Sequence, residues 1–152
     1  MASILQKQAA LVEEFAALGD DWQARYARII ARAKQLAPMA EALKSDSSKV
    51  RGCSSTVWLT ASFSDGKVHY QADSDAILVK GLVELLLSVY SGHTPREIAS
   101  ADPVFIEELG LNVNLSPNRA NGLSAMVVQL KHLAQGFAAT VNAANTAKPP
   151  LT

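Results

Sequence analysis

The only cysteine of this sequence, Cys53, lies in the stretch KVRGCSSTVWL, between a basic turn and an apolar segment. Lys49 and Arg51 precede it, and positive charge near a thiol favours the thiolate, which is the nucleophilic form. Gly52 removes side-chain bulk beside the sulfur, and Ser54 adds a hydroxyl after it. An unperturbed thiol, with a pKa of about 8.5, is mostly protonated at neutral pH, so these surroundings decide its reactivity.

Two interpretations of Cys53 stay open on these features alone. A lone cysteine is most often a small buried hydrophobic residue. However, Cys53 lies at the junction of a polar loop and a strand, outside any apolar stripe. This position gives a reactive thiol about the same weight as a buried structural one. Without a second cysteine it cannot act as a dithiol oxidoreductase. An exposed, mobile thiolate could still accept sulfur from a persulfide, by the chemistry of thiol–disulfide exchange.

The other residues that could do chemistry form no recognisable site. The three histidines, His69, His93 and His132, are scattered and lack the spacing of metal ligands. His69 falls in a predicted strand, and no motif supports it as a base for Cys53. The sequence contains no glycine-rich phosphate loop and no G-x-S-x-G motif. We therefore expect this chain to bind no metal and no cofactor of its own.

The segments before the cysteine predict a helical hairpin and a loop. Residues 3–18 and 21–37 each carry an apolar stripe at helical spacing, and a glycine separates them. On the second helix, Arg25, Arg28 and Arg32 lie opposite the stripe, which predicts either a solvated face or a docking surface. Residues 44–52 are polar and rich in turn formers, so we expect an exposed loop there.

The segments after the cysteine predict a β-hairpin and further helices. Residues 55–63 and 67–73 have strand composition and flank an Asp65-Gly66 turn. Because a two-stranded ribbon is marginal alone, it must lie on helices or recruit a further strand. The apolar segment 73–92 predicts a central buried helix, with Asp73 and Asp75 as capping residues.

The last part of the chain completes a single predicted domain. Two short helices are expected after residue 93, with Asp102-Pro103 opening the second, and then a long final helix that starts at Ser116-Pro117. Together these elements predict one α+β domain over residues 1–141, in which a small antiparallel sheet packs against helices. Residues 142–152 are expected to form a flexible tail.

Charge and hydropathy exclude some partners. Fourteen Lys and Arg residues balance fourteen Asp and Glu residues, and this balance argues against a protein that binds nucleic-acid backbones. The longest apolar run, residues 76–90, contains Lys80 and Glu84 and is too short to cross a bilayer. Glu13 and Glu14 interrupt the N-terminal segment, which therefore does not read as a signal peptide. We expect a cytoplasmic protein with no nucleic-acid or membrane partner.

Three separated segments resemble the SufE/CsdE family, the sulfur-acceptor proteins that work with cysteine desulfurases in iron–sulfur cluster assembly. They are GCSSTVWL, ADSDAILVKGLVELLLSVYSGHTPREI and LSPNRANGLSAMV, in the family's order and spacing. The resemblance covers about residues 5 to 135. It implies an α+β fold shared with the IscU-type cluster scaffolds. Those scaffolds hold iron with several cysteines, so a single cysteine makes a cluster-holding role unexpected here.

The resemblance also implies a function for Cys53. It would take a persulfide sulfur from the active-site cysteine of a desulfurase, stimulate that enzyme, and pass the sulfur to a cluster scaffold or another acceptor. The pyridoxal phosphate belongs to the desulfurase. Asp75 and Arg119 match family positions, and with Arg51, Gly52 and Ser54 they are candidates for shaping the cysteine loop or docking the partner. Family members often have Gln where this chain has Ser54, a departure that leaves the thiol chemistry intact.

Two other functions stay open from the residues. The chain could be a non-covalent desulfurase adaptor that docks through Arg25, Arg28 and Arg32, with Cys53 only structural. It could also be a thiol redox sensor, in which Cys53 forms a sulfenic acid or a mixed disulfide. In the acceptor role the chain would be a sulfur carrier and activator rather than an enzyme that works alone.

Overall fold

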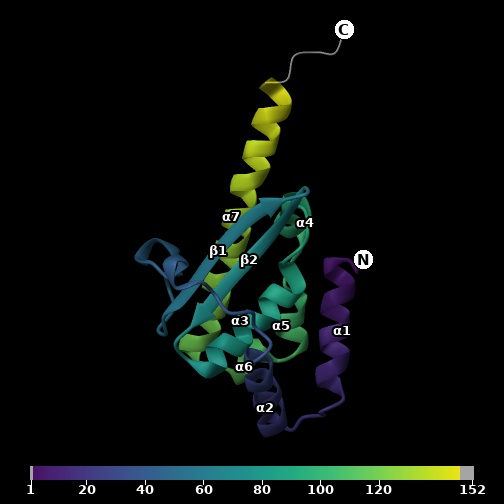
Figure 1. The fold of residues 1–152 in the computed structure, drawn as a ribbon. Helices are drawn as coiled ribbons and strands as arrows, with labels where there is room; N and C mark the ends of the chain where they lie inside the picture. The colour runs from purple at the N-terminus through teal and green to yellow at the C-terminus, as the bar shows by residue number, and fades with distance from the viewer. Residues whose placement is uncertain (1, 148–152) are drawn as a thin grey trace.

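The computed structural model describes residues 2–147, with side-chain surroundings for residues 2–139, and it opens with the two predicted helices (Figure 1). Helix α1 spans Ile4–Ala16 and helix α2 spans Trp22–Ala33. The hydroxyl of Ser3 and the carboxylate of Asp21 cap the two helices by accepting hydrogen bonds from backbone amides of the first turn. Helix α2 packs along the central helix α3, and α1 packs against α3 and α5.

The predicted β-hairpin is confirmed. Strands β1 (Val57–Ser64) and β2 (Lys67–Ser74) pair antiparallel around an Asp65-Gly66 turn in which both residues have positive φ. One face of this two-stranded sheet is buried and lies on helices α3 and α7, as Figure 1 shows. The buried side chains of that face are those of Val57, Leu59, Val68, Tyr70 and Ala72.

Helix α3 (Ile77–Tyr90) is the central buried helix that the apolar segment predicts. At Gly81 the helix meets α2 so closely that an added Cβ would lie 2.1 Å from the carbonyl oxygen of Ile29. A glycine is therefore required at this crossing. Helix α3 joins the hairpin to the N-terminal helices and carries the middle of the core.

The predicted capping of α3 by Asp73 and Asp75 is wrong. The helix starts after Ala76, which makes no side-chain capping bond. Asp73 instead binds Lys44 at 2.7 Å and Lys80 at 3.3 Å. Asp75 turns back toward the segment that precedes β1 and serves the cysteine loop rather than the helix.

Three short helices, rather than two, precede the final helix: α4 (Pro95–Ser100), α5 (Val104–Glu108) and α6 (Leu111–Asn114). Thr94 caps α4, and Pro103, not Asp102, occupies the N-cap of α5. Helix α7 spans Pro117–Ala147 and projects past the turn of the hairpin (Figure 1). It therefore includes residues 142–147 of the expected tail, and residues 148–152 lie outside the described residues.

These elements form the predicted α+β arrangement, with a small antiparallel sheet on helices and one hydrophobic core. The largest fully buried side chains come from α3 and from the helices around it, and they include Phe15, Ile29, Tyr90, Phe105 and Leu130. Within the part of the chain that the structure describes, no helix has the length and hydropathy to cross a membrane.

Candidate functional site

The cysteine loop, residues 51–56, is closed at its base by backbone pairing. The amide of Val50 donates to the carbonyl oxygen of Val57 at 2.8 Å, and Lys49 forms a bridge with Trp58. Two short 3-10 turns, Glu41–Leu43 and Asp46–Ser48, lead into this base. The region predicted as an exposed loop is exposed over most of its length, except that Val50 is buried.

Asp75 holds the other end of the loop. Its carboxylate accepts a hydrogen bond from the Thr56 amide at 3.1 Å, and its own amide donates to the Thr56 carbonyl at 3.2 Å. The hydroxyl of Ser74 donates to the same carbonyl at 2.9 Å. Asp75 therefore binds the loop at Thr56, and its role in shaping the loop or docking a partner stays a prediction.

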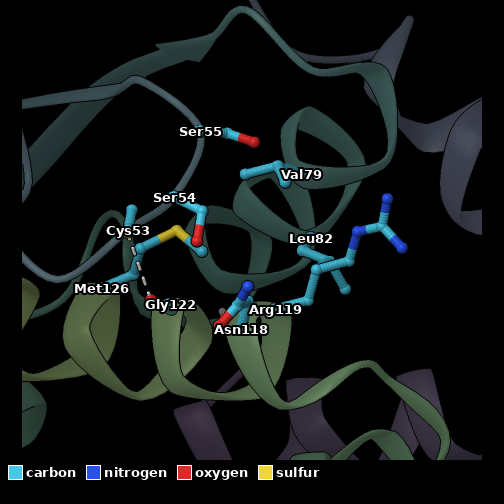
Figure 2. Close-up of a pocket in the computed structure, with 9 residues that line it drawn as sticks. All are labelled: Cys53, Ser54, Ser55, Val79, Leu82, Asn118, Arg119, Gly122 and Met126. Carbon is cyan, nitrogen blue, oxygen red and sulfur yellow. Dashed lines mark hydrogen bonds between the residues drawn. The ribbon is translucent and has the colours of Figure 1, made fainter.

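The tip of the loop lies on helix α7. Gly52 has a φ of +92°, and a Cβ added to it would lie 3.2 Å from the Cβ of Ala125. The backbone of the loop thus approaches the helix where only glycine adopts this conformation without strain. Beside it, the Cys53 thiol donates to the carbonyl oxygen of Gly122 at 3.5 Å (Figure 2).

Cys53 lines a small pocket between the loop, α3 and α7 (Figure 2). Besides the thiol, Ser54 and Ser55 come from the loop, Val79 and Leu82 from α3, and Asn118, Arg119, Gly122 and Met126 from α7. Most of the exposed lining is apolar. The Arg119 side chain lies at the rim and points away from the sulfur in Figure 2.

The electrostatic state of Cys53 differs from the sequence expectation. The thiol is half-buried rather than exposed, and burial raises the pKa of Cys53 above its usual value. Lys49 does not serve the sulfur, because its ammonium binds Asp46 at 3.0 Å. Arg51 is exposed to solvent. In this conformation burial favours the protonated thiol over the thiolate.

The structure does not bring His69 to the cysteine. His69 pairs with Ser62 near the turn end of the hairpin, whereas Cys53 lies beyond the opposite end of β1. No group of His, Cys, Asp and Glu residues among the described residues could hold a metal ion.

The arginine face of α2 is largely occupied within the fold. Arg32 binds Glu14 at 3.0 Å and Glu84 at 2.8 Å, and only 13% of its side chain is exposed. Arg25 donates to the carbonyl oxygens of Gly19 and Leu109 at 2.8 and 2.9 Å. Of the three arginines, Arg28 alone is classed as exposed, so this face supports the adaptor hypothesis poorly.

Sequence reasoning named Arg119 on the α7 side of the pocket and missed the three other α7 residues that line it. Asn118, Gly122 and Met126 lie four residues apart and therefore share one face of α7. On this face the Cys53 sulfur reaches the helix backbone at the carbonyl oxygen of Gly122. This spacing is readable in LSPNRANGLSAMV, but it indicates a contact face only once the position of the loop is known.

Comparisons with known proteins identify the family of this chain. Residues 9–134 match the family described as "SufE: Fe-S metabolism associated domain". The chain belongs to the SufE family. A SufE-like protein of Synechocystis is 48% identical over 121 residues, which cover 80% of this chain and 76% of that protein. SufE-like proteins of Rhizobium etli and Rhizobium meliloti are 39% and 37% identical, over 91% and 83% of this chain and 94% and 93% of their own lengths.

A solved structure supports the same fold for this SufE family member. The solution structure of a hypothetical protein from Thermus thermophilus superposes with a TM-score of 0.71 at 23% identity. The match covers 86% of this chain and 94% of the Thermus protein. At that identity the likeness concerns the fold, and it extends over nearly all of both chains.

Proposed function

We propose that Cys53 accepts a sulfur atom from the persulfide of a cysteine desulfurase, stimulates that enzyme, and delivers the sulfur to iron–sulfur cluster assembly. The observation that carries this proposal is the placement of the chain's only thiol, on a loop anchored at both ends and over a small, mostly apolar pocket. Membership of a family associated with iron–sulfur metabolism supports it. A persulfide sulfur on Cys53 would lie in this pocket between turnovers.

The proposed transfer is a thiol–persulfide exchange. The Cys53 thiolate attacks the terminal sulfur of the donor persulfide, a new S–S bond forms at Cys53, and the donor's S–S bond breaks. The donor cysteine leaves as a thiolate, and the terminal sulfur carries its proton or charge with it. No external oxidant or reductant is needed, because one S–S bond replaces another. The pyridoxal phosphate that generates the donor persulfide belongs to the desulfurase.

The exchange requires a second position of the loop. In the pocket the thiol is half-buried and its pKa is raised, and both properties oppose attack on a partner's sulfur. Residues 51–55 lie between the anchors at Val50 and Thr56, so the tip can turn outward while the base stays paired. We propose that desulfurase binding favours the outward position and that the persulfide then returns to the pocket.

A redox-sensor function receives less support from the same geometry. Sensor thiols are exposed and have a lowered pKa, which increases their reaction with peroxide. Cys53 has the opposite properties in this conformation. A role in sulfur transfer needs a reduced cysteine, which suits the cytoplasmic location predicted from the sequence.

Intact-protein mass spectrometry tests the proposal directly. The purified protein is mixed with a cysteine desulfurase from the same organism and with L-cysteine. We expect Cys53 to gain the mass of one sulfur atom, which dithiothreitol then removes. Cys53→Ser is expected to gain no sulfur and to lose the stimulation of desulfurase turnover. Full stimulation by Cys53→Ser would contradict the acceptor function.

A further inference from the structure

Next to the cysteine loop, a groove runs between the loop's N-terminal side and helix α7. It is lined by Ser47, Lys49, Val50, Arg51, Ala125, Val128 and Gln129. We infer that this groove docks an acidic segment of the desulfurase that also carries an apolar side chain. The inference rests on the proposed function, because it assigns the surface that brings the sulfur donor to Cys53.

The charge of the groove favours a carboxylate from a partner. Its lining contains two cations and no acidic residue. Within the described part of the chain, the Arg51 guanidinium makes no hydrogen bond or ion pair, and Lys49 is held only by Asp46, whose side chain is 97% exposed. A planar guanidinium binds a carboxylate through two parallel hydrogen bonds, so Arg51 can fix the direction of an incoming Asp or Glu.

The apolar part of the groove favours a hydrophobic side chain from the same segment. Val128 is 66% exposed, although its neighbours Val127 and Leu130 on the same helix are buried in the core. Together with Ala125 it forms an uncharged strip opposite Arg51. Burial of such a strip stabilises a complex by about 25 cal/mol for each Å² of apolar surface removed from water.

The position of the groove suits the donor. Arg51 is separated from Cys53 only by Gly52, which itself contacts Ala125. A segment held by Arg51 and Val128 would therefore sit beside the tip of the loop and leave the Cys53 pocket unobstructed. A second groove, formed mainly by α5 and its neighbours, is lined by Asp102 and Glu107 and carries the opposite charge, so an acidic segment would be directed away from it.

The test compares groove variants with matched surface variants. Val128→Asp and Arg51→Glu change the groove, whereas Val113→Asp and Arg96→Glu place the same changes on exposed residues of α6 and α4. Affinity for the desulfurase is measured without L-cysteine, so that no sulfur transfer contributes. We expect each groove variant to weaken binding by about tenfold or more and each control to stay within about twofold. Circular dichroism should show all four variants folded.

Two further measurements make the outcome unambiguous. A photo-crosslinking amino acid at position 128 should link to the desulfurase, and one at position 113 should not. The groove assignment would be overturned if Val128→Asp bound the desulfurase with unchanged affinity. It would also be overturned if the groove variants bound the desulfurase normally but no longer delivered sulfur to a downstream acceptor. The proposed function fails separately, if the wild-type protein gains no sulfur from the desulfurase.

Discussion

The thiol of Cys53 lies 3.5 Å from the carbonyl oxygen of Gly122, a residue far along the chain on helix α7. This contact joins the cysteine loop to the final helix and holds the sulfur in its pocket. An added Cβ at Gly122 would lie 3.5 Å from the sulfur, at ordinary contact distance, so there is room for a methyl group here. Larger side chains at this position would compete with the sulfur for the same space.

Substitutions at Gly122 should therefore separate the two positions of the loop. Gly122→Ala adds a methyl group in ordinary contact and should keep Cys53 protected. Gly122→Leu should expel the sulfur from the pocket into water. Solvation then lowers the pKa of the thiol, and each pH unit of lowering increases the thiolate fraction at neutral pH by about tenfold. The rate of Cys53 reaction with a thiol reagent such as dithionitrobenzoate measures this. Equal rates in the two variants would show that Gly122 does not control the loop.

Cys53 should ionise at higher pH in the folded protein than in the unfolded chain. Burial raises its folded pKa, so the apparent midpoint of the alkylation rate should exceed the value of about 8.5 that is typical of a free thiol. Stability from this group is complete at pH values below the unfolded pKa and is lost as pH rises through the folded pKa. The same measurement in denaturant supplies the reference. A midpoint below the denatured value would contradict the buried resting state.

Removal of the Asp75 carboxylate should loosen the cysteine loop. Asp75→Ala deletes the acceptor of the Thr56 amide and should lower the free energy of unfolding by about 1 kcal/mol. The more informative effect is faster reaction of Cys53 with a thiol reagent, because the loop samples its outward position more often. Glu13→Ala, an exposed change on α1, is the matched control. If both variants react at the wild-type rate, Asp75 does not restrain the loop.

The crossing of α2 and α3 should not tolerate a side chain at Gly81. In Gly81→Ala the new Cβ would lie 2.1 Å from the Ile29 carbonyl oxygen, so the helices must separate, at a cost of about 1–3 kcal/mol. Urea denaturation measures this loss. Gly136→Ala provides the contrast, since its Cβ would meet no atom within 4 Å and alanine favours a helix interior by about 1 kcal/mol. Equal stability of the two variants would refute the steric account.

His93 should make the fold sensitive to mild acid. The ring is buried, and its Nε2 has no hydrogen-bond partner among the described residues. Burial lowers the pKa of His93 most, and the positive charges of Lys7 and Lys67 lower it further. The Glu97 carboxylate, 3.5 Å from Nδ1, raises this pKa but offsets the lowering only in part. Because the folded pKa lies below the unfolded value of about 6.5, stability is complete above that pH and is lost as pH falls through the interval.

Thermal denaturation at pH 7.5 and pH 5.5 checks this expectation. One proton contributes a slope of at most about 1.4 kcal/mol for each pH unit. His93→Gln should reduce the difference in melting temperature between the two conditions, and His132→Gln, at an exposed position, should leave it unchanged. A wild-type difference retained in full by His93→Gln would assign the acid sensitivity to other groups.

Local signals in the sequence determined most of the elements. Apolar residues at helical spacing located α1, α2, α3 and α7, and strand composition around Asp65-Gly66 located the hairpin. These signals act over a few residues, through backbone preference and side-chain periodicity. The cysteine was also found from the sequence, because a lone thiol between a polar loop and a strand stands out, and the family resemblance then indicated its role.

Only the tertiary structure decided what each charged group does. Asp73 and Asp75 have the spacing of helix caps, yet one binds Lys44 and Lys80 and the other binds the loop at Thr56. Likewise, Arg32 belongs to a polar stripe in the sequence but binds Glu14 and Glu84 inside the fold. Their partners are distant in the chain, so periodicity along one helix cannot reveal them.

The state of Cys53 was decided in the same way. The nearby cations in the sequence predict a lowered thiol pKa, but α7 packs over the loop and burial raises it. A charged group affects a pKa through its distance in space, not through its distance in sequence. Here the sulfur bonds the Gly122 carbonyl oxygen on α7, whereas the Lys49 ammonium binds Asp46. The sequence determined which atom could carry sulfur, and the packing of α7 decided that it rests protonated and shielded, because burial disfavours the charged form of a thiol.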